Sequence, residues 1–344
     1  MPVPVKLPSN QFDHFYRGGD RIGALRHGPG GPQRPEEWIG SATTRFGEAL
    51  QGLSHLPDGM LLRDAVAADP VSWLGAAHVD RYGSEGVELL VKLLDPNQRL
   101  PVHAHPQRPF AQQHLGSPHG KTEAWIILES DPGAVVGLGF NRVVEHDEMV
   151  ALVRAHDSDT LLDLMVTRTV RAGDGIFVPA GVPHYIDPGI LIVELQEPTD
   201  FSILLEWDGL AVDGDSDGHL GLGFDLALQA VDRSAWTQER VQQCVRPLAA
   251  GAPTSRVLPK EADAYFRAHR LAPGDGVVKV EAGLAILMVL EGSGELTPAA
   301  ATSLPVQKGD AVLVPWCSGE WELTGAVSGI LCRPPAPDVA PPLV

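Results

Sequence analysis

The segment from Arg99 to His184 constrains the fold of this chain most strongly, because its polar side chains recur on short apolar runs. At its start, His103 and His105 stand two residues apart within the run 100–106. Side chains two apart on a β-strand point to the same face of the sheet, so both imidazoles can approach one interior point. We therefore expect a strand here whose inner face carries two histidines.

Two more side chains with lone pairs follow in the same segment. Glu123 opens the apolar run 123–128, and His184 ends the glycine- and proline-rich stretch 172–184. Three neutral imidazoles and one carboxylate suit Zn2+, Fe2+, Mn2+, Co2+ or Ni2+, and they leave room for an oxygen ligand from a substrate. The predicted ligands of one divalent metal ion are His103, His105, Glu123 and His184.

The composition favours many short strands over long helices. The 344 residues include 37 glycines and 30 prolines, and only 6% of them are aromatic, a balance typical of chains with many turns. The predicted strands are the runs 87–95, 123–128, 134–140, 167–171, 175–178, 189–196 and 201–206, and a small helical insertion is predicted over 141–164. One strand with two alternating histidines and a later one that leads to a third are the pattern of a cupin, a small jelly-roll barrel.

A second β pattern resumes after Gly276. The run 308–315 repeats the order of the run 172–179, namely Gly-Asp, apolar residues and proline, which indicates an internal repeat and a second barrel. No histidine follows His269, so this second barrel cannot rebuild a three-imidazole site. We expect it to be free of metal.

These patterns predict a mainly β fold made of two cupin-type jelly-roll barrels. Residues 1–207 are predicted to form the metal-binding barrel with its helical insertion. Residues 208–272 are predicted to form a helical connecting region, and residues 273–344 the metal-free barrel.

Several other features are expected to be structural or solvated. Residues 107–119 are polar and are predicted to form an irregular loop at the mouth of the site, with His119 in solvent, while His14 belongs to no constellation. The acidic run 213–218 resembles the opening of a calcium loop but lacks the glutamate required at position 12, so we expect an acidic surface loop. The tryptophans predicted to fill the barrel cores are Trp125, Trp316 and Trp321.

Charge and cysteine content limit the partners and the compartment. A formal net charge of −18 argues against nucleic acid, and it requires a locally basic pocket for any phosphorylated substrate. The three cysteines are widely spaced and odd in number, which favours a reducing compartment. Neither a leader segment nor an uncharged run of membrane-spanning length is visible. We expect a cytoplasmic protein, monomeric or homodimeric, with a sugar or sugar phosphate as its small-molecule partner and no membrane.

Four of these stretches together resemble type I mannose-6-phosphate isomerase. They are the runs 90–95, 120–125, 178–184 and 194–196, and the resemblance spans about residues 10–335. It implies a zinc ion in the first barrel, bound by a glutamine, two histidines and a glutamate. By position, His105, Glu123 and His184 match three of these ligands, and His103 stands at the glutamine position.

Two positions depart from the family pattern where the resemblance implies substrate contacts. Pro101 replaces a serine, and proline offers neither a hydroxyl nor an N–H to a phosphate. Leu204 replaces an arginine that faces the substrate, and losing such a cation forfeits charge-assisted hydrogen bonds of ~1.5–3 kcal/mol each. Lys121 remains, so a phosphate on the substrate does not follow from the resemblance.

The resemblance implies an aldose–ketose isomerase, which moves a proton between C1 and C2 of an opened sugar through a cis-enediol. A metal would stabilise the developing negative charge, and a positioned base and cation would assist. We assign the base to Glu194, substrate orientation or polarisation of O1 or O2 to Lys121, and hydroxyl binding to Asp200.

Two other functions fit the same residues. A cupin oxygenase would hold Fe2+ with the same three histidines and one glutamate, and would leave positions open for O2. A non-catalytic sugar-binding protein would keep the metal and lack the chemistry.

Overall fold

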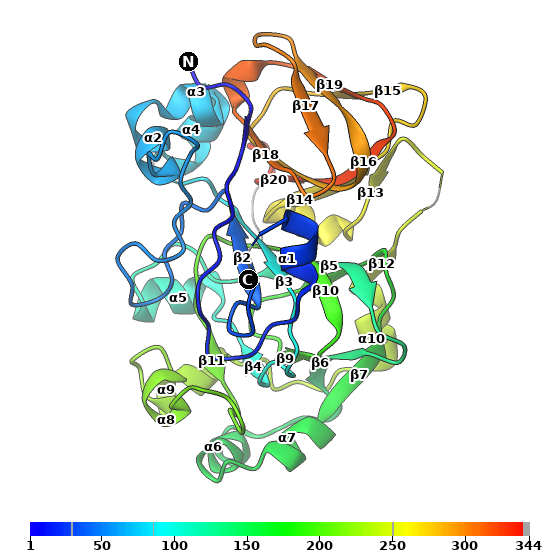
Figure 1. Cartoon of the computed structure of the whole chain (residues 1–344). Coiled ribbons are helices and arrows are strands. Elements are labelled where there is room, and N and C mark those ends of the chain that lie inside the picture. Colours follow the sequence, from blue (N-terminus) through cyan, green and yellow to red (C-terminus); the bar gives the residue numbers. More distant parts are fainter. Residues whose placement is uncertain (29, 85, 250, 340–344) are drawn as a thin grey trace.

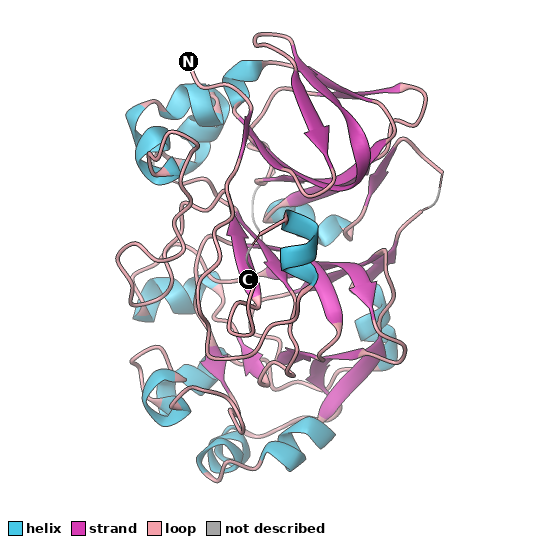
Figure 2. Cartoon of the chain, in the orientation of Figure 1, coloured by secondary structure: helices cyan, strands magenta, loops and turns pink. Residues whose placement is uncertain are grey.

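The computed structural model describes residues 1–28, 30–84, 86–249 and 251–339, and it is built mainly from antiparallel strands (Figure 1). The mainly β prediction is confirmed. Figure 2 shows the strands in the middle of the molecule and the helices mostly along its edges.

The first β region contains a six-stranded sheet in the order β12-β8-β5-β10-β3-β2. Its strands are β2 (Glu36–Ile39), β3 (Leu90–Leu94), β5 (Glu123–Ser130), β8 (Asp174–Val178), β10 (Ile190–Gln196) and β12 (Val245–Pro247). Every residue of β10 is buried, because both faces of this sheet are covered by other layers.

A five-stranded sheet in the order β11-β4-β9-β6-β7 lies against one face of the six-stranded sheet. Its strands are β4 (His103–Ala104), β6 (Val135–Phe140), β7 (Met165–Thr169), β9 (His184–Ile186) and β11 (Ile203–Leu204). Trp125 and Ile192 of the six-stranded sheet share one apolar core with Leu138 and Ile186 of the five-stranded sheet. The two sheets therefore form a sandwich.

The second β region is a nine-stranded sheet with the main path β1-β18-β16-β20-β14-β13. Its strands are β1 (Val5–Lys6), β13 (Thr254–Arg256), β14 (Arg267–Leu271), β15 (Val277–Val280), β16 (Ala285–Pro298), β17 (Leu304–Gln307), β18 (Ala311–Val314), β19 (Trp321–Thr324) and β20 (Val327–Arg333). The long strand β16 pairs with β18 and β20 in its first half and with β17 and β19 in its second. It thereby wraps a separate apolar core that includes Leu287, Val312 and Trp321.

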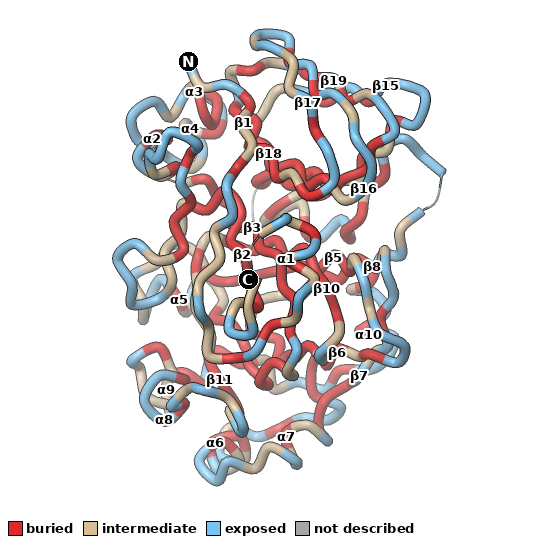
Figure 3. The backbone as a smooth tube through the Cα atoms, viewed as in Figure 1, coloured by how far each residue is buried: buried red, intermediate tan, exposed pale blue. Residues whose placement is uncertain are grey.

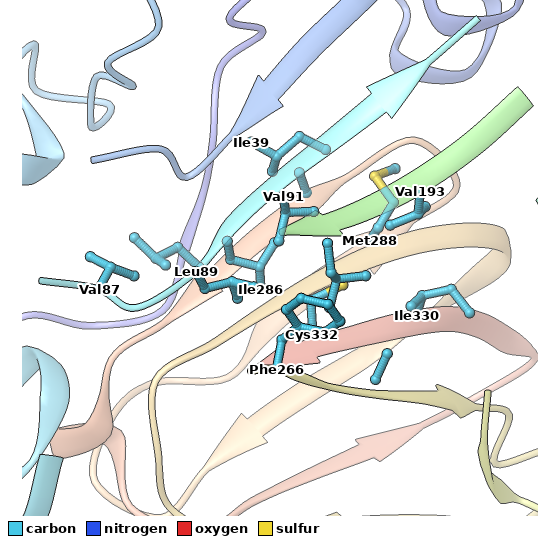
Figure 4. Close-up of a cluster of buried hydrophobic side chains, with 14 of the residues drawn as sticks. Ile39, Val87, Leu89, Val91, Val193, Phe266, Ile286, Met288, Ile330 and Cys332 are labelled. Atoms are coloured by element: carbon cyan, nitrogen blue, oxygen red, sulfur yellow. The ribbon is translucent and has the colours of Figure 1, made fainter. Parts of the chain in front are cut away.

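A third apolar cluster joins the two regions (Figure 4). Val91 and Val193 pack on one face of the six-stranded sheet. Ile192, which precedes Val193, packs in the sandwich core on the other face. This follows from the two-residue alternation of a strand. Ile286 and Met288 meet them from the second region. Figure 3 shows the resulting band of buried backbone through the middle of the molecule.

The helices are all short. They are α1 (Arg21–Arg26), α2 (Leu62–Ala68), α3 (Pro70–Leu74), α4 (Ala76–Tyr82), α5 (Arg108–His114), α6 (His146–Arg154), α7 (Ser158–Asp163), α8 (Gly214–Asp217), α9 (Phe224–Ala227) and α10 (Gln238–Gln243), with the 3-10 turns η1 (Leu228–Ala230), η2 (Lys260–Ala264) and η3 (Trp316–Ser318). Across the residues described, none has the length and apolar character that a bilayer crossing requires.

Three sequence-based expectations need comment. The predicted loop 107–119 is wrong in part, since it contains the helix α5, whose few apolar residues hide its periodicity while Pro109 starts its first turn. Trp316 is 41% exposed in η3 and fills no core, whereas Trp125 and Trp321 are buried as predicted. The helical insertion appears as α6 and α7.

The connecting region 208–272 contributes strands to both β regions. Its strand β12 pairs with β8 in the six-stranded sheet, while β13 and β14 join the nine-stranded sheet. The proposed division into domains stays a prediction, and the end of its last part, 340–344, lies outside the described residues.

Candidate metal centre and substrate pocket

Three of the four predicted ligands converge at one end of the first sandwich. The antiparallel pair β4–β9 sets His103 directly opposite His184, and His105 follows β4. All three side chains are buried, and one ring nitrogen from each lies within 4.8 Å of the others. A buried group of three imidazoles fits a metal site.

Main-chain carbonyls fix the orientation of all three rings. Each ring contacts a carbonyl through Nδ1: His103 to Pro101 at 2.8 Å, His105 to Phe201 at 2.7 Å and His184 to Val182 at 2.8 Å. A carbonyl oxygen only accepts hydrogen bonds, so each Nδ1 carries the proton. The lone pairs are then on the Nε2 atoms, which is the tautomer that binds metal ions.

Glu123 faces two of these nitrogens. Its Oε2 lies 3.0 Å from Nε2 of His105, and its Oε1 lies 3.3 Å from Nε2 of His184. The nitrogen of His184 is buried without a hydrogen-bond partner among the described residues. Lone pairs of nitrogen and carboxylate oxygen repel one another unless a cation lies between them. The donor set therefore fits a cation, with Glu123 against two of the histidines.

The charge states also suit a metal. Burial lowers the pKa of His103 well below its usual value, and burial followed by the charge of Lys121 lowers the pKa of His105 to about 3. Burial favours the protonated acid at Glu123, but Lys121 and the histidines outweigh it and hold the pKa of Glu123 well below its ordinary value. The rings of His103 and His105 are thus neutral, and the carboxylate of Glu123 is ionised, near neutral pH.

Lys121 lies beside this centre, on the face predicted from its spacing to Glu123. Its Nζ is 3.0 Å from Oε2 of Glu123 and 2.9 Å from Nε2 of His105. The ammonium group therefore contacts the nitrogen that a metal ion would take. An ion bound at this nitrogen would displace the ammonium group from it.

A cavity of about 710 Å³ opens directly beside the histidines. His103 and Lys121 line its inner end, and Glu194 and Asp200 line its wall. The predicted catalytic and substrate-binding residues are thus brought together, although their roles are not tested by this arrangement. A cavity of this volume is in the range of small-molecule sites.

Comparisons with known proteins show what the chain is similar to. No protein-family model matches the chain. It is 37% identical over 134 residues to mannose-6-phosphate isomerase of Streptococcus mutans, which covers 38% of the chain and 41% of that relative. It is 27% identical over 242 residues to mannose-6-phosphate isomerase ManA of Bacillus subtilis, which covers 69% of the chain and 72% of the relative.

In sequence, this chain is similar to named mannose-6-phosphate isomerases.

Solved structures show that the family fold extends over nearly the whole chain. The mannose 6-phosphate isomerase of Bacillus subtilis superposes with a TM-score of 0.75 at 21% identity, covering 96% of this chain and 100% of that one. A putative mannosephosphate isomerase from Archaeoglobus fulgidus gives a TM-score of 0.73 at 17% identity, covering 98% and 99%. At these identities the likeness shows the fold alone.

Glu194 is a buried acid of the pocket wall whose pKa is strongly raised. It lies in the middle of β10, opposite Lys92 on β3, and its Oε2 is 3.7 Å from Nζ of Lys92. Burial, followed by the nearby charge of Glu123, raises the pKa of Glu194 to about 8. A carboxyl group whose pKa is moved toward neutrality can both take up and release a proton at physiological pH.

Sequence reasoning missed Lys92, which links three acids in the pocket wall. Its Nζ lies 3.3 Å from Glu36, 3.7 Å from Glu194 and 3.7 Å from Asp200, and 4.4 Å from the centre of the Trp38 ring. Glu36 in turn accepts a 2.6 Å hydrogen bond from the buried hydroxyl of a tyrosine, Tyr16. The available signal was a single lysine inside the apolar run 89–94, because a buried lysine requires partners.

Two histidines also behave differently from expectation. His14 was assigned to no constellation, but it lines the cavity and lies 3.7 Å from Glu36. His119 was expected in solvent, but its side chain is only 20% exposed and contacts Glu88 at 2.8 Å. Both contacts join segments far apart in the sequence, so no local pattern could reveal them.

The two positions that depart from the family pattern lie in the same wall. Pro101 and Leu204 both line the cavity, and the pairing of β11 with β4 puts Leu204 opposite His103. At these two positions the lining beside His103 is therefore apolar.

Proposed function

We propose that this chain is a metal-dependent aldose–ketose isomerase that interconverts mannose 6-phosphate, or a related sugar, and the corresponding fructose form through a cis-enediol. The curated relatives carry that activity in their names. The observation that carries the proposal is the buried group of three converging imidazoles, two of which face Glu123 and one of which, His103, lines a cavity of small-molecule size.

The proposed ligands are His103, His105, His184 and Glu123, and the proposed ion is zinc, as in the family that the sequence resembles. When bound, the ion would act as a Lewis acid that stabilises negative charge on the two sugar oxygens next to the transferred proton. The same nitrogen and oxygen donors accept other divalent transition metals as well.

The other roles follow from position. Glu194 is the proposed base that carries a proton between C1 and C2, because its pKa of about 8 lets it exist in both protonation states near neutrality. Lys121, released from His105, donates to O1 or O2. Asp200 accepts hydrogen bonds from sugar hydroxyls at the cavity wall.

We also infer that the enzyme works in the reducing cytoplasm, as a monomer or homodimer. All three cysteines are free thiols, and Cys332 is buried.

The decisive experiment follows exchange of the sugar's C2 proton with D2O by NMR, on protein whose metal content is measured. We expect exchange and aldose–ketose interconversion with a metal-to-protein ratio near one. In Lys121→Ala, turnover should fall about 100-fold while metal content stays near normal, since one electrophilic donor typically contributes that much. Absence of exchange with every mannose- and fructose-type sugar, phosphorylated or free, would refute the proposal, and oxygen consumption would indicate an oxygenase instead.

A further inference from the structure

The cavity beside the histidines carries more negative than positive side chains. Its cationic lining residues are Arg45, Lys92 and Lys121. Its acidic lining residues are Glu36, Glu48, Asp200, Asp213 and Asp217, together with Glu194, whose raised pKa keeps it largely protonated near neutral pH. The protein as a whole has a net charge of −18, so the surroundings do not offset this excess.

Both lysines are already committed to carboxylates. The ammonium of Lys92 is shared among Glu36, Glu194 and Asp200 at 3.3–3.7 Å. That of Lys121 lies against Glu123 and the histidines at the inner end. Neither lysine is free to neutralise an anionic group farther along the cavity.

The wall beside His103 offers no further cation. Leu204 and Pro101 have no side-chain donor, and Ser202, which also lines the cavity, offers only a neutral hydroxyl. Beyond them the wall continues to Asp213 and Asp217, at the two ends of α8, and both are exposed. The acidic run of the sequence thus borders the pocket.

Arg45 is the one cation of the cavity's outer half within the described part of the chain. Its Nη1 donates to Gln51 at 3.1 Å, and the residue is half-buried on the rim shared with a neighbouring cavity. Glu48 lines the same rim three residues later. Arg45 therefore shares the lining of the cavity with Glu48 and the two aspartates of α8.

We propose that the preferred substrate of this enzyme has an uncharged distal end, namely a free aldose or ketose of the mannose–fructose type, and that a phosphorylated sugar is disfavoured. The inference rests on the proposed isomerase function. A phosphate group brings a charge of about −1.5 to −2 into a pocket of like sign. Sugar hydroxyls, by contrast, donate hydrogen bonds to carboxylates and gain from the same lining.

The test compares kcat/KM for free mannose and for mannose 6-phosphate on the same metal-loaded protein, by C2 exchange in D2O. We expect free mannose to be preferred at least tenfold, and inorganic phosphate not to compete with it. A preference for mannose 6-phosphate would overturn this inference while leaving the isomerase proposal intact. Exchange with neither sugar nor any relative of them would overturn both.

A variant without the two α8 charges tests whether these aspartates cause the preference for free mannose. In Asp213→Asn combined with Asp217→Asn, the ratio of kcat/KM for phosphorylated over free mannose should rise at least threefold. The matched control is Glu295→Gln combined with Glu320→Gln, two exposed acids of the second β region. It removes the same two charges elsewhere, so the ratio should stay unchanged. A rise in the control equal to that in the α8 variant would show that net charge, and not the pocket, sets the preference.

Arg45→Gln completes the series. If Arg45 binds a phosphate, the unmodified protein should prefer mannose 6-phosphate. The variant should then lose turnover of mannose 6-phosphate and prefer free mannose. We expect instead that the unmodified protein already prefers free mannose. The ratio of kcat/KM for phosphorylated over free mannose should then change less than threefold in Arg45→Gln.

Discussion

The two β regions place different residues at the same point of a shared pattern. In the first region, strand β8 ends before a proline turn, and the next strand, β9, begins with His184. In the second region, β18 ends before Pro315 and η3, and the next strand, β19, begins with Trp321. Both side chains are 1% exposed. One points its lone pair at a carboxylate, and the other fills an apolar core.

The difference shows how one architecture supports either chemistry or stability. The core of the second region is apolar, with Leu287 and Val312 beside Trp321. The end of the first sandwich instead buries imidazoles and acids, which cost free energy unless they are paired with one another or with an ion. We therefore expect changes in the first region to act on metal content and turnover, and changes in the second to act on the free energy of unfolding.

The largest expected effect is that of His184→Ala. Removing one of three converging nitrogens should lower metal content to a small fraction and turnover by about a thousandfold or more, because a Lewis acid contributes several kcal/mol to the transition state. Metal analysis and C2 exchange would measure both. Normal metal content in this variant would show that His184 is not a metal ligand. The proposed difference in role between His184 and Trp321 would then be wrong.

Glu194→Gln should lower turnover by about 100- to 10,000-fold, the usual contribution of a general base. The amide has nearly the shape of the acid but cannot take up the proton. Metal content should stay near that of the unmodified protein, which separates this role from that of a ligand. Turnover within threefold of the original would remove Glu194 from the mechanism.

Trp321→Ala should lower stability and leave metal content unchanged. The cavity left in the second core should lower the free energy of unfolding by about 3–5 kcal/mol, measured by urea denaturation. The metal-to-protein ratio should remain unchanged, provided the protein is assayed where it is folded. Loss of metal from a folded Trp321→Ala protein would mean that the two regions are not separate in function.

A smaller effect concerns acid. Burial alone favours the protonated form of Glu36, but the charges of His14 and Lys92 and the hydroxyl of Tyr16 hold its pKa far below the ordinary 4.5. An acid with a lowered pKa stabilises the fold above its unfolded pKa, and this contribution is lost as pH falls below about 4.5. Glu36→Gln should therefore lower the free energy of unfolding at pH 7 by about 1–3 kcal/mol and flatten its decline between pH 5 and pH 3.

An equal loss at pH 3 and at pH 7 would contradict this assignment. It would show that the variant disturbs packing around Trp38 and not the ion pair with Lys92. The second region offers a control in Glu322, whose exposed contact with Lys279 should change stability by about 1 kcal/mol or less when the acid is replaced.

The sequence alone determined the polar end of the first sandwich, because its signal is local. The two-residue spacing predicted that His103 and His105 approach one point, and that Lys121 lies beside Glu123, although in the structure His105 follows β4 and Lys121 precedes β5. The absence of histidine after His269 likewise decided that the second region could not carry the same site.

The tertiary structure alone decided the rest of the pocket, because that depends on which strands pair and where loops return. Lys92 meets its partners since β3 lies between β2 and β10, which sets Trp38 and Glu194 on either side of it. His14 and the aspartates of α8 reach the cavity through connections of many residues, whose closure no local periodicity records. Strand geometry therefore fixed the metal-binding pattern, whereas the charge of the pocket was fixed only by long-range pairing.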